Sequence, residues 1–234
     1  MLFVVAVAAF LVAYNTVVNL RPLPRWTYLP LNLAVAAIFV GAARLQGETW
    51  QELGLGLSGL AAGIGWGLGA SVVVAAGMVG ARWLTGVVPG LRALLRDRRA
   101  ADLPPRRLAY DTLVRIPLGT AVCEEVLFRG VLLAAMLGVA SLAQAVVASS
   151  ALFGLWHIGP TLRALRENDA AARRTPVVVA AVVITALGGV GFALLRVVSG
   201  SLAAPVLVHW AINASGLLAA HTYQSAEAQH PQRT

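Results

Sequence analysis

Long apolar runs separated by short polar segments are the dominant pattern of this chain. A helix crosses the hydrocarbon core of a bilayer with about 20 apolar residues, and seven runs are close to that length or exceed it. They lie at residues 2–20, 29–43, 59–83, 111–137, 141–157, 176–198 and 202–220. Because proline kinks or breaks a helix, the fourth run counts as two if it is split at Pro117. The predicted fold class is therefore all-α, a polytopic transmembrane helix bundle of about seven spans, or eight with that split.

The composition excludes an ordinary soluble domain. Hydrophobic residues make up 59% of the 234 positions and charged residues only 12%, and the mean hydropathy is +0.77. A soluble protein is roughly half apolar and a quarter charged. All 18 basic residues are arginine, a bias typical of a GC-rich bacterium. We therefore expect an integral protein of a bacterial cell membrane.

Arginine placement predicts the orientation. The two strongly basic loops, residues 85–110 and 161–175, fall on the same side if seven spans alternate. Cytoplasmic loops carry the excess of basic residues, so the N-terminus is predicted outside and the C-terminus inside. These loops would contact anionic lipid headgroups. They have almost no interleaved aromatic residues, so we do not expect nucleic acid as a partner.

Small residues and the two chain ends add three expectations. Glycines 59, 63 and 67, with 65 and 69 beside them, are spaced four apart and predict close helix packing. The apolar run at residues 2–20 has no basic n-region and is predicted to be a retained span. Residues 221–234 are predicted to be a disordered polar tail.

Few strongly polar groups lie inside the predicted spans, and each charge there costs about 2.5–3.5 kcal/mol on insertion scales. Such groups face the bundle interior and usually pair there. They are Glu124, Glu125, Arg129, His157, Arg196, His209 and Asn213. Of these, Arg196 lies near the outer end of its run and is predicted to extend toward the interface.

Spacing assigns different roles to the two glutamates. Glu125 and Arg129 are four residues apart, which favours a structural ion pair within one helix. Glu124 is rotated by about 100° from Glu125 and remains free to face other helices. His209 and Asn213 share one face of the last predicted span, and Phe153 and His157 repeat the same spacing.

Two chemistries fit these groups. A water activated by Glu124 and His157, facing donors from His209 and Asn213, has the parts needed for peptide hydrolysis. Alternatively, Glu124, His157 and His209 could hold zinc with an open coordination position. Spacing alone leaves both readings open.

The motifs Glu124-Glu125-xxx-Arg129, Phe153-xxx-His157 and His209-xxx-Asn213, in this order on successive apolar runs, resemble the CPBP family. This family includes the type II CAAX prenyl endopeptidases and the bacteriocin-processing or immunity (ABI) proteins. The resemblance covers about residues 108–218. It implies an all-helical intramembrane endopeptidase that cleaves a membrane-associated protein or peptide.

Carried over by position, the resemblance implies that Glu124 activates the water with help from His157. His209 and Asn213 would form the oxyanion hole, and Glu125 and Arg129 would support the site. Because Asn213 fits an oxyanion donor better than a zinc ligand, we expect no metal cofactor, with zinc as the alternative.

The resemblance also divides the chain. Residues 1–107 are expected to be membrane helices plus a basic loop without a matching motif, residues 108–220 the catalytic bundle, and residues 221–234 the tail. Two alternatives remain: a non-catalytic immunity or scaffold protein of the same family, and a proton-coupled transporter. A kink at Pro117 is expected to bring Glu124 level with His157, in a cavity open to the cytoplasm.

Overall fold

The computed structural model describes residues 1–20, 24–88, 97–101, 103–168 and 174–229. Six helices are long and apolar enough to cross a membrane. They are α1 (Leu2–Leu20), α2 (Tyr28–Leu45), α3 (Leu60–Val87), α8 (Leu142–Trp156), α10 (Arg174–Ser199) and α11 (Ala203–Gln229). No strand occurs in the described ranges. The predicted all-α polytopic bundle is confirmed.

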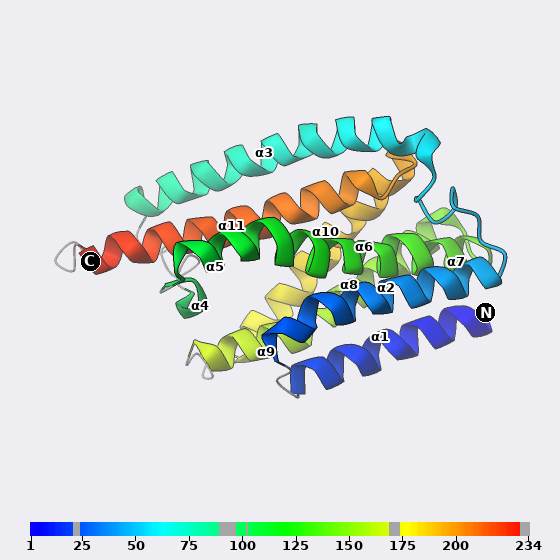
Figure 1. Cartoon of the computed structure of the whole chain (residues 1–234), viewed down its shortest axis with the longest axis horizontal. Helices are drawn as coiled ribbons and strands as arrows, with labels where there is room; N and C mark the ends of the chain where they lie inside the picture. The colour runs from blue at the N-terminus through cyan, green and yellow to red at the C-terminus, as the bar shows by residue number, and fades with distance from the viewer. Residues whose placement is uncertain (21–23, 89–96, 102, 169–173, 230–234) are drawn as a thin grey trace.

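The fourth apolar run is one helical segment through the middle of the bundle (Figure 1). It consists of α5 (Pro105–Tyr110), η4 (Asp111–Val122), α6 (Cys123–Glu125), η5 (Val126–Leu132) and α7 (Leu133–Leu137). We call Asp111–Leu137 the central segment. Its η4 and η5 turns are π-helical, and this wider turn accommodates Pro117 without ending the helix. The alternative of eight spans, with this run split at Pro117, is therefore not realised.

The central segment forms the core. Leu127, Phe128, Val131 and Leu132 are fully buried, and they pack among residues from α1, α2, α8, α10 and α11. The central segment is not among the six candidate spans, because it carries more charged residues than such a span has. It lies inside the protein instead, covered by helices that face lipid.

Polar contacts fix α2 against η4. The Asn32 amide donates to the Gly119 carbonyl at 2.8 Å, and Tyr28 bonds Thr120 at 3.0 Å. At the start of η4, the buried Asp111 carboxylate accepts from Arg107 and Arg115, four residues away on either side. The contacts of α2 join η4 about one turn before the two glutamates.

Only one of the two glycine rows packs as expected. A Cβ added at Gly63 would lie 2.6 Å from the Ser201 Cβ, and one at Gly67 would lie 2.8 Å from Leu207, so this row allows α3 to approach α11. Gly65 and Gly69 have nothing within 4 Å of an added Cβ. The second row makes no such close approach and lines a groove between α3 and Leu195 of α10.

The helices alternate in direction, so connections gather at two ends (Figure 1). The short helices α4 (Arg98–Ala101) and α9 (Ile158–Glu167) lie at the same end as the C-terminus of α11. This end carries most of the described loop arginines, and Arg21, Arg92, Arg96 and Arg173 lie outside the described residues. The predicted alternation is present. Which end faces the cytoplasm stays a prediction.

Two sequence expectations are wrong. The predicted tail is helical as far as Gln229, while residues 230–234 lie outside the described ranges. In it His221 bonds the Ala100 carbonyl at 2.7 Å, and Tyr223 packs beside Ala219, which explains the added turns. The predicted loop at 161–175 begins as a helix, because α9 continues to Glu167.

Arg196 is held by the turn before α3. Its side chain is buried, and its Nη2 donates to the carbonyls of Gln51 (3.0 Å) and Glu52 (2.8 Å). Gly54, at φ +73°, gives the guanidinium room, since an added Cβ would lie 2.1 Å from its Nε. Arg196 therefore ties α10 to the turn before α3.

The same turn contains a local hydrogen-bond pair. The Thr49 hydroxyl and N–H donate to the exposed Glu52 carboxylate and hold the pKa of that carboxyl below its ordinary value.

Candidate functional site

The site begins with three charged groups on the central segment. The side chains of Glu124, Glu125 and Arg129 are 8%, 0% and 1% exposed. They lie at the centre of the bundle because α6 and η5 are surrounded by other helices. Charges this deeply buried need partners, and the structure supplies them from α8, α10 and α11.

Glu125 contacts two other members of the cluster. Its Oε1 accepts from Arg129 Nη1 at 3.2 Å and contacts His209 Nδ1 at 2.7 Å. The ion pair expected from the four-residue spacing is present. The second partner, His209, lies 84 positions further along the chain and was not foreseen.

Aromatic rings complete the surroundings of Arg129. Its guanidinium carbon lies 4.0 Å from the Phe153 ring centre and 5.2 Å from that of Phe192. Within the described residues Arg129 Nε and Nη2 have no hydrogen-bond partner, so cation–π attraction takes that place. Gly189 leaves space, since an added Cβ would lie 3.0 Å from Nη2.

Glu124 faces two other groups. Its Oε1 accepts a hydrogen bond from the Trp156 indole at 3.2 Å. Its Oε2 lies 3.9 Å from His209 Nε2 and has no hydrogen-bond partner among the residues that the structure describes. Glu124 Oε1 is thus hydrogen-bonded, whereas Oε2 is buried and has no hydrogen-bond donor among the described residues. Glu124 thus faces residues of two other helices, α8 and α11.

The His209 ring lies between the two carboxylates. It stacks on Phe192, with ring centres 5.1 Å apart and 15° between planes, and meets the edge of Phe153 at 6.0 Å. A carboxylate at Nδ1 fixes the proton on that nitrogen and orients the ring. Nε2 is then directed toward Glu124.

His157 is placed differently from the expectation. It ends α8 and begins α9, is half-buried, and its Nδ1 bonds the Phe153 carbonyl at 2.8 Å. No hydrogen bond or ion pair within the described ranges joins it to Glu124. The preceding residue, Trp156, makes that contact instead. His157 lies against the edge of Phe153, whose ring also meets His209.

Asn213 lies one turn after His209 on α11 and is half-buried. In the described part of the chain its amide makes no hydrogen bond. An unengaged amide one helical turn after His209 is free to donate to a bound group.

The alternative zinc ligands are not gathered into one cluster. Among the described residues no group of three or more His, Cys, Asp or Glu side chains is close enough to hold a metal ion. Glu124 and His209 approach each other, while His157 bonds its own helix. The residues as placed do not fit a zinc site, and no step is assigned to a metal.

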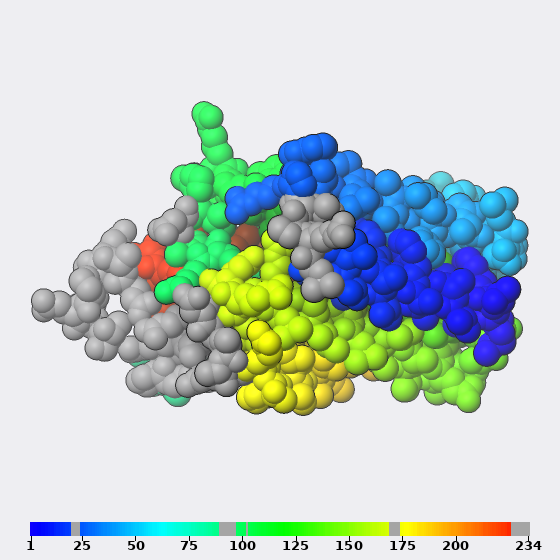
Figure 2. Space-filling model, turned by 90° about the horizontal axis from the view of Figure 1, so that it is seen from below, coloured from blue at the N-terminus to red at the C-terminus, as the bar shows by residue number. Residues whose placement is uncertain are grey.

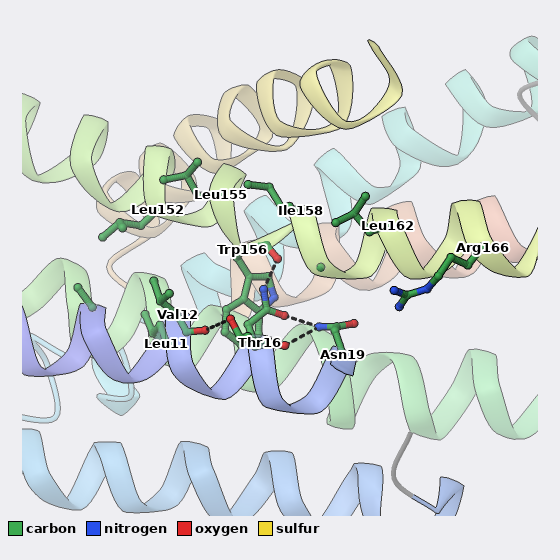
Figure 3. A pocket seen from close by; sticks show the side chains of 13 residues that line it. Leu11, Val12, Thr16, Asn19, Leu152, Leu155, Trp156, Ile158, Leu162 and Arg166 are labelled. Carbon is green, nitrogen blue, oxygen red and sulfur yellow. Dashed lines mark hydrogen bonds between the residues drawn. The ribbon is translucent and has the colours of Figure 1, made fainter. Parts of the chain in front are cut away.

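Figure 2 shows α1 side by side with α8 and α9 on one face of the protein. An apolar pocket of about 410 Å³ lies between these helices, beside the site (Figure 3). Trp156 forms part of its wall, and Arg166 lies at the arginine-rich end (Figure 3). Glu124 does not line it. This pocket is therefore not the cavity expected around Glu124 and His157, although Trp156 lines the pocket and donates to Glu124.

Sequence reasoning missed Trp156, Phe192 and the Glu125–His209 contact. A tryptophan directly before the motif histidine carries an N–H donor, which was an available signal. Phe192 gave none, because an apolar side chain in an apolar run has no distinguishing pattern.

Comparison with known proteins supports the motif reading. No curated protein and no solved structure gives a significant match. Residues 108–215 match the family model of the type II CAAX prenyl endopeptidase Rce1-like proteins, and this range contains all six candidate site residues. The resemblance to the CAAX protease-like CPBP family is therefore confirmed over residues 108–215.

Proposed function

We propose that this protein is an intramembrane endopeptidase that hydrolyses a peptide bond of a membrane-associated protein or peptide. The observation that carries the proposal is the open Oε2 of Glu124, buried and 3.9 Å from His209 Nε2. A buried carboxylate oxygen without a partner is costly, and a bound water or substrate group would satisfy it.

The water is proposed to bind between Glu124 and His209. Glu124 takes one proton from it, and the resulting hydroxide attacks the carbonyl carbon of the substrate. The Trp156 indole holds the other carboxylate oxygen at 3.2 Å, so that Oε2 keeps its direction. Glu124 then returns the proton to the leaving amine as the C–N bond breaks.

The developing oxyanion is proposed to be stabilised by the Asn213 amide and by His209 Nε2–H. Donation from Nε2 requires a proton on both ring nitrogens, with Nδ1–H held by Glu125 at 2.7 Å. Arg129 positions Glu125. His157, where α8 ends and α9 begins, is proposed to assist in binding the water when substrate is present.

This mechanism uses no metal cofactor. Membrane lipid and a membrane-associated polypeptide are the proposed partners, and nucleic acid is not one. A prenylated substrate is not part of the proposal, because nothing in the site selects one. We propose that the N-terminus lies outside and the C-terminus in the cytoplasm.

The test is cleavage of a peptide library by purified protein in liposomes, with Glu124→Gln and Glu48→Gln as a matched pair. General acid–base catalysis contributes about a hundredfold to ten-thousandfold, so Glu124→Gln should lose at least about a hundredfold in rate. Glu48 lies in the distant turn after α2, so Glu48→Gln should cleave normally.

Thermal unfolding of both variants checks that the fold is retained. If the wild type cleaves nothing across the library, the non-catalytic reading of the family is favoured. Equal cleavage by Glu124→Gln and wild type would show that Glu124 is not the catalytic base.

A further inference from the structure

The pocket beside the site has a shape and lining suited to a hydrocarbon chain. Apolar side chains line most of it, among them Leu11 and Val12 on α1 and Leu152, Leu155 and Leu162 on α8 and α9 (Figure 3). Its lining spans Ala8 to Asn19 along α1, about 16 Å at 1.5 Å per residue. That length equals about half of a 30 Å bilayer core, the depth of one leaflet.

The polar groups on the α1 side of the pocket are already engaged. Asn19 donates to the Asn15 carbonyl and side chain at 2.8 and 2.6 Å, and Asn15 donates to the Trp156 carbonyl. The Thr16 hydroxyl bonds the Val12 carbonyl at 2.7 Å. An occupant therefore meets mainly apolar side chains along the pocket, which disfavours a polar metabolite.

Arg166 is the exception. Its guanidinium lies at one end of the pocket, beyond Leu162 and turned back toward α1 (Figure 3). In the described ranges it makes no hydrogen bond or ion pair, whereas Arg163 on the same helix is paired with Glu167 at 2.9 Å. An exposed positive charge without a partner among the described residues, at the end of an apolar pocket, suits an amphipathic anion.

We propose that this pocket binds an anionic phospholipid, with one acyl chain against α1 and α8 and the headgroup phosphate at Arg166. Basic pockets between membrane helices recognise anionic headgroups in this way. The site lies at the arginine-rich end, where the bundle would meet such headgroups. The proposal does not depend on peptidase activity, although Trp156 places the chain one side chain away from Glu124.

The experiment is native mass spectrometry of the purified full chain titrated with phosphatidylglycerol or phosphatidylcholine. The wild type should retain one phosphatidylglycerol in preference to phosphatidylcholine. Arg166→Gln should weaken phosphatidylglycerol binding about fivefold, the factor that corresponds to about 1 kcal/mol for one arginine at an anionic surface. Arg163→Gln, on the same helix but outside the pocket, is the matched control and should bind as the wild type does.

A second pair of variants tests the acyl chain. Val12→Trp fills the pocket and should abolish the preferred lipid, whereas Val5→Trp lies on the same helix two turns earlier, outside the pocket, and should not. Both valines are more than half exposed, so neither change should unfold the protein.

Equal losses in Arg166→Gln and Arg163→Gln, or equal binding by the two tryptophan variants, would overturn the proposal. Displacement of the lipid by a cleaved peptide, one for one, would assign the pocket to the substrate and overturn it as well.

Discussion

At the scale of single residues, the site depends on one fully buried salt bridge with a third member. Glu125 holds both Arg129 and His209 through the same oxygen. Burying a charge is tolerated only when its partner remains, because removal of one partner leaves the other uncompensated. The cluster is therefore more sensitive to single changes than to paired ones.

Arg129→Leu should destabilise the protein by about 3–5 kcal/mol, since it leaves the Glu125 charge buried beside a hydrophobic side chain. The double variant Glu125→Gln/Arg129→Leu should recover part of this loss. Thermal unfolding in one detergent measures both. The exposed pair Arg163–Glu167 is the control, and Arg163→Leu should cost less than about 1 kcal/mol. A double variant less stable than Arg129→Leu would contradict the argument.

Trp156 is expected to position Glu124. Trp156→Phe keeps an aromatic ring against Phe128 and Tyr14 but removes the N–H that Glu124 accepts. A hydrogen bond to a charged group contributes about 1.5–3 kcal/mol, so kcat should fall by about tenfold or more with little change in KM. Trp66→Phe, on the exposed side of α3, should leave kcat unchanged. A loss confined to KM would place Trp156 in substrate binding instead.

At the scale of helices, the two glycine rows of α3 show what a sequence can and cannot predict. Both rows repeat every four residues, so the sequence predicts close packing for each. Only the row with Gly63 and Gly67 meets α11, because the rotation of α3 is set by its partner. The partner of Arg196 was hidden for the same reason, since it lies 145 positions away in the chain.

Gly63→Ala and Gly65→Ala form a matched pair two residues apart. The added methyl at 63 would overlap the Ser201 side chain and should cost about 1–3 kcal/mol. At 65 it meets open space and should stabilise the helix by about 0.5–1 kcal/mol. Unfolding temperatures of the two variants in the same detergent are the measurement, and shifts in the same direction would refute the assigned interface.

At the scale of the whole molecule, the pattern of apolar runs was sufficient to predict a helical bundle and the alternating direction of its helices. The motif spacing predicted the ion pair of Glu125 with Arg129, which is present, but it did not predict the contact of Glu125 with His209. It could not place His157, because the change from α8 to α9 at that residue leaves its ring bonded to Phe153. Local spacing fixes which face a side chain shares, while its distance to another helix depends on packing.

The proposed orientation can be measured by cysteine labelling. In a Cys123→Ala background, a cysteine at the exposed Ser58 should react with an impermeant maleimide on intact cells. A cysteine at Arg106, at the arginine-rich end, should react only after the membrane is opened. The reverse pattern would show that the C-terminus lies outside.

The charges of the central segment also have a consequence for biogenesis. If this segment left the translocon alone, Glu124, Glu125 and Arg129 would together cost about 8–10 kcal/mol in lipid. Helices α1 and α2 are made before it and contact it in the finished protein, so they can shelter it on entry. His209 is made almost last and completes the cluster. Membrane insertion of this chain is thus coupled to the order in which its helices are synthesised.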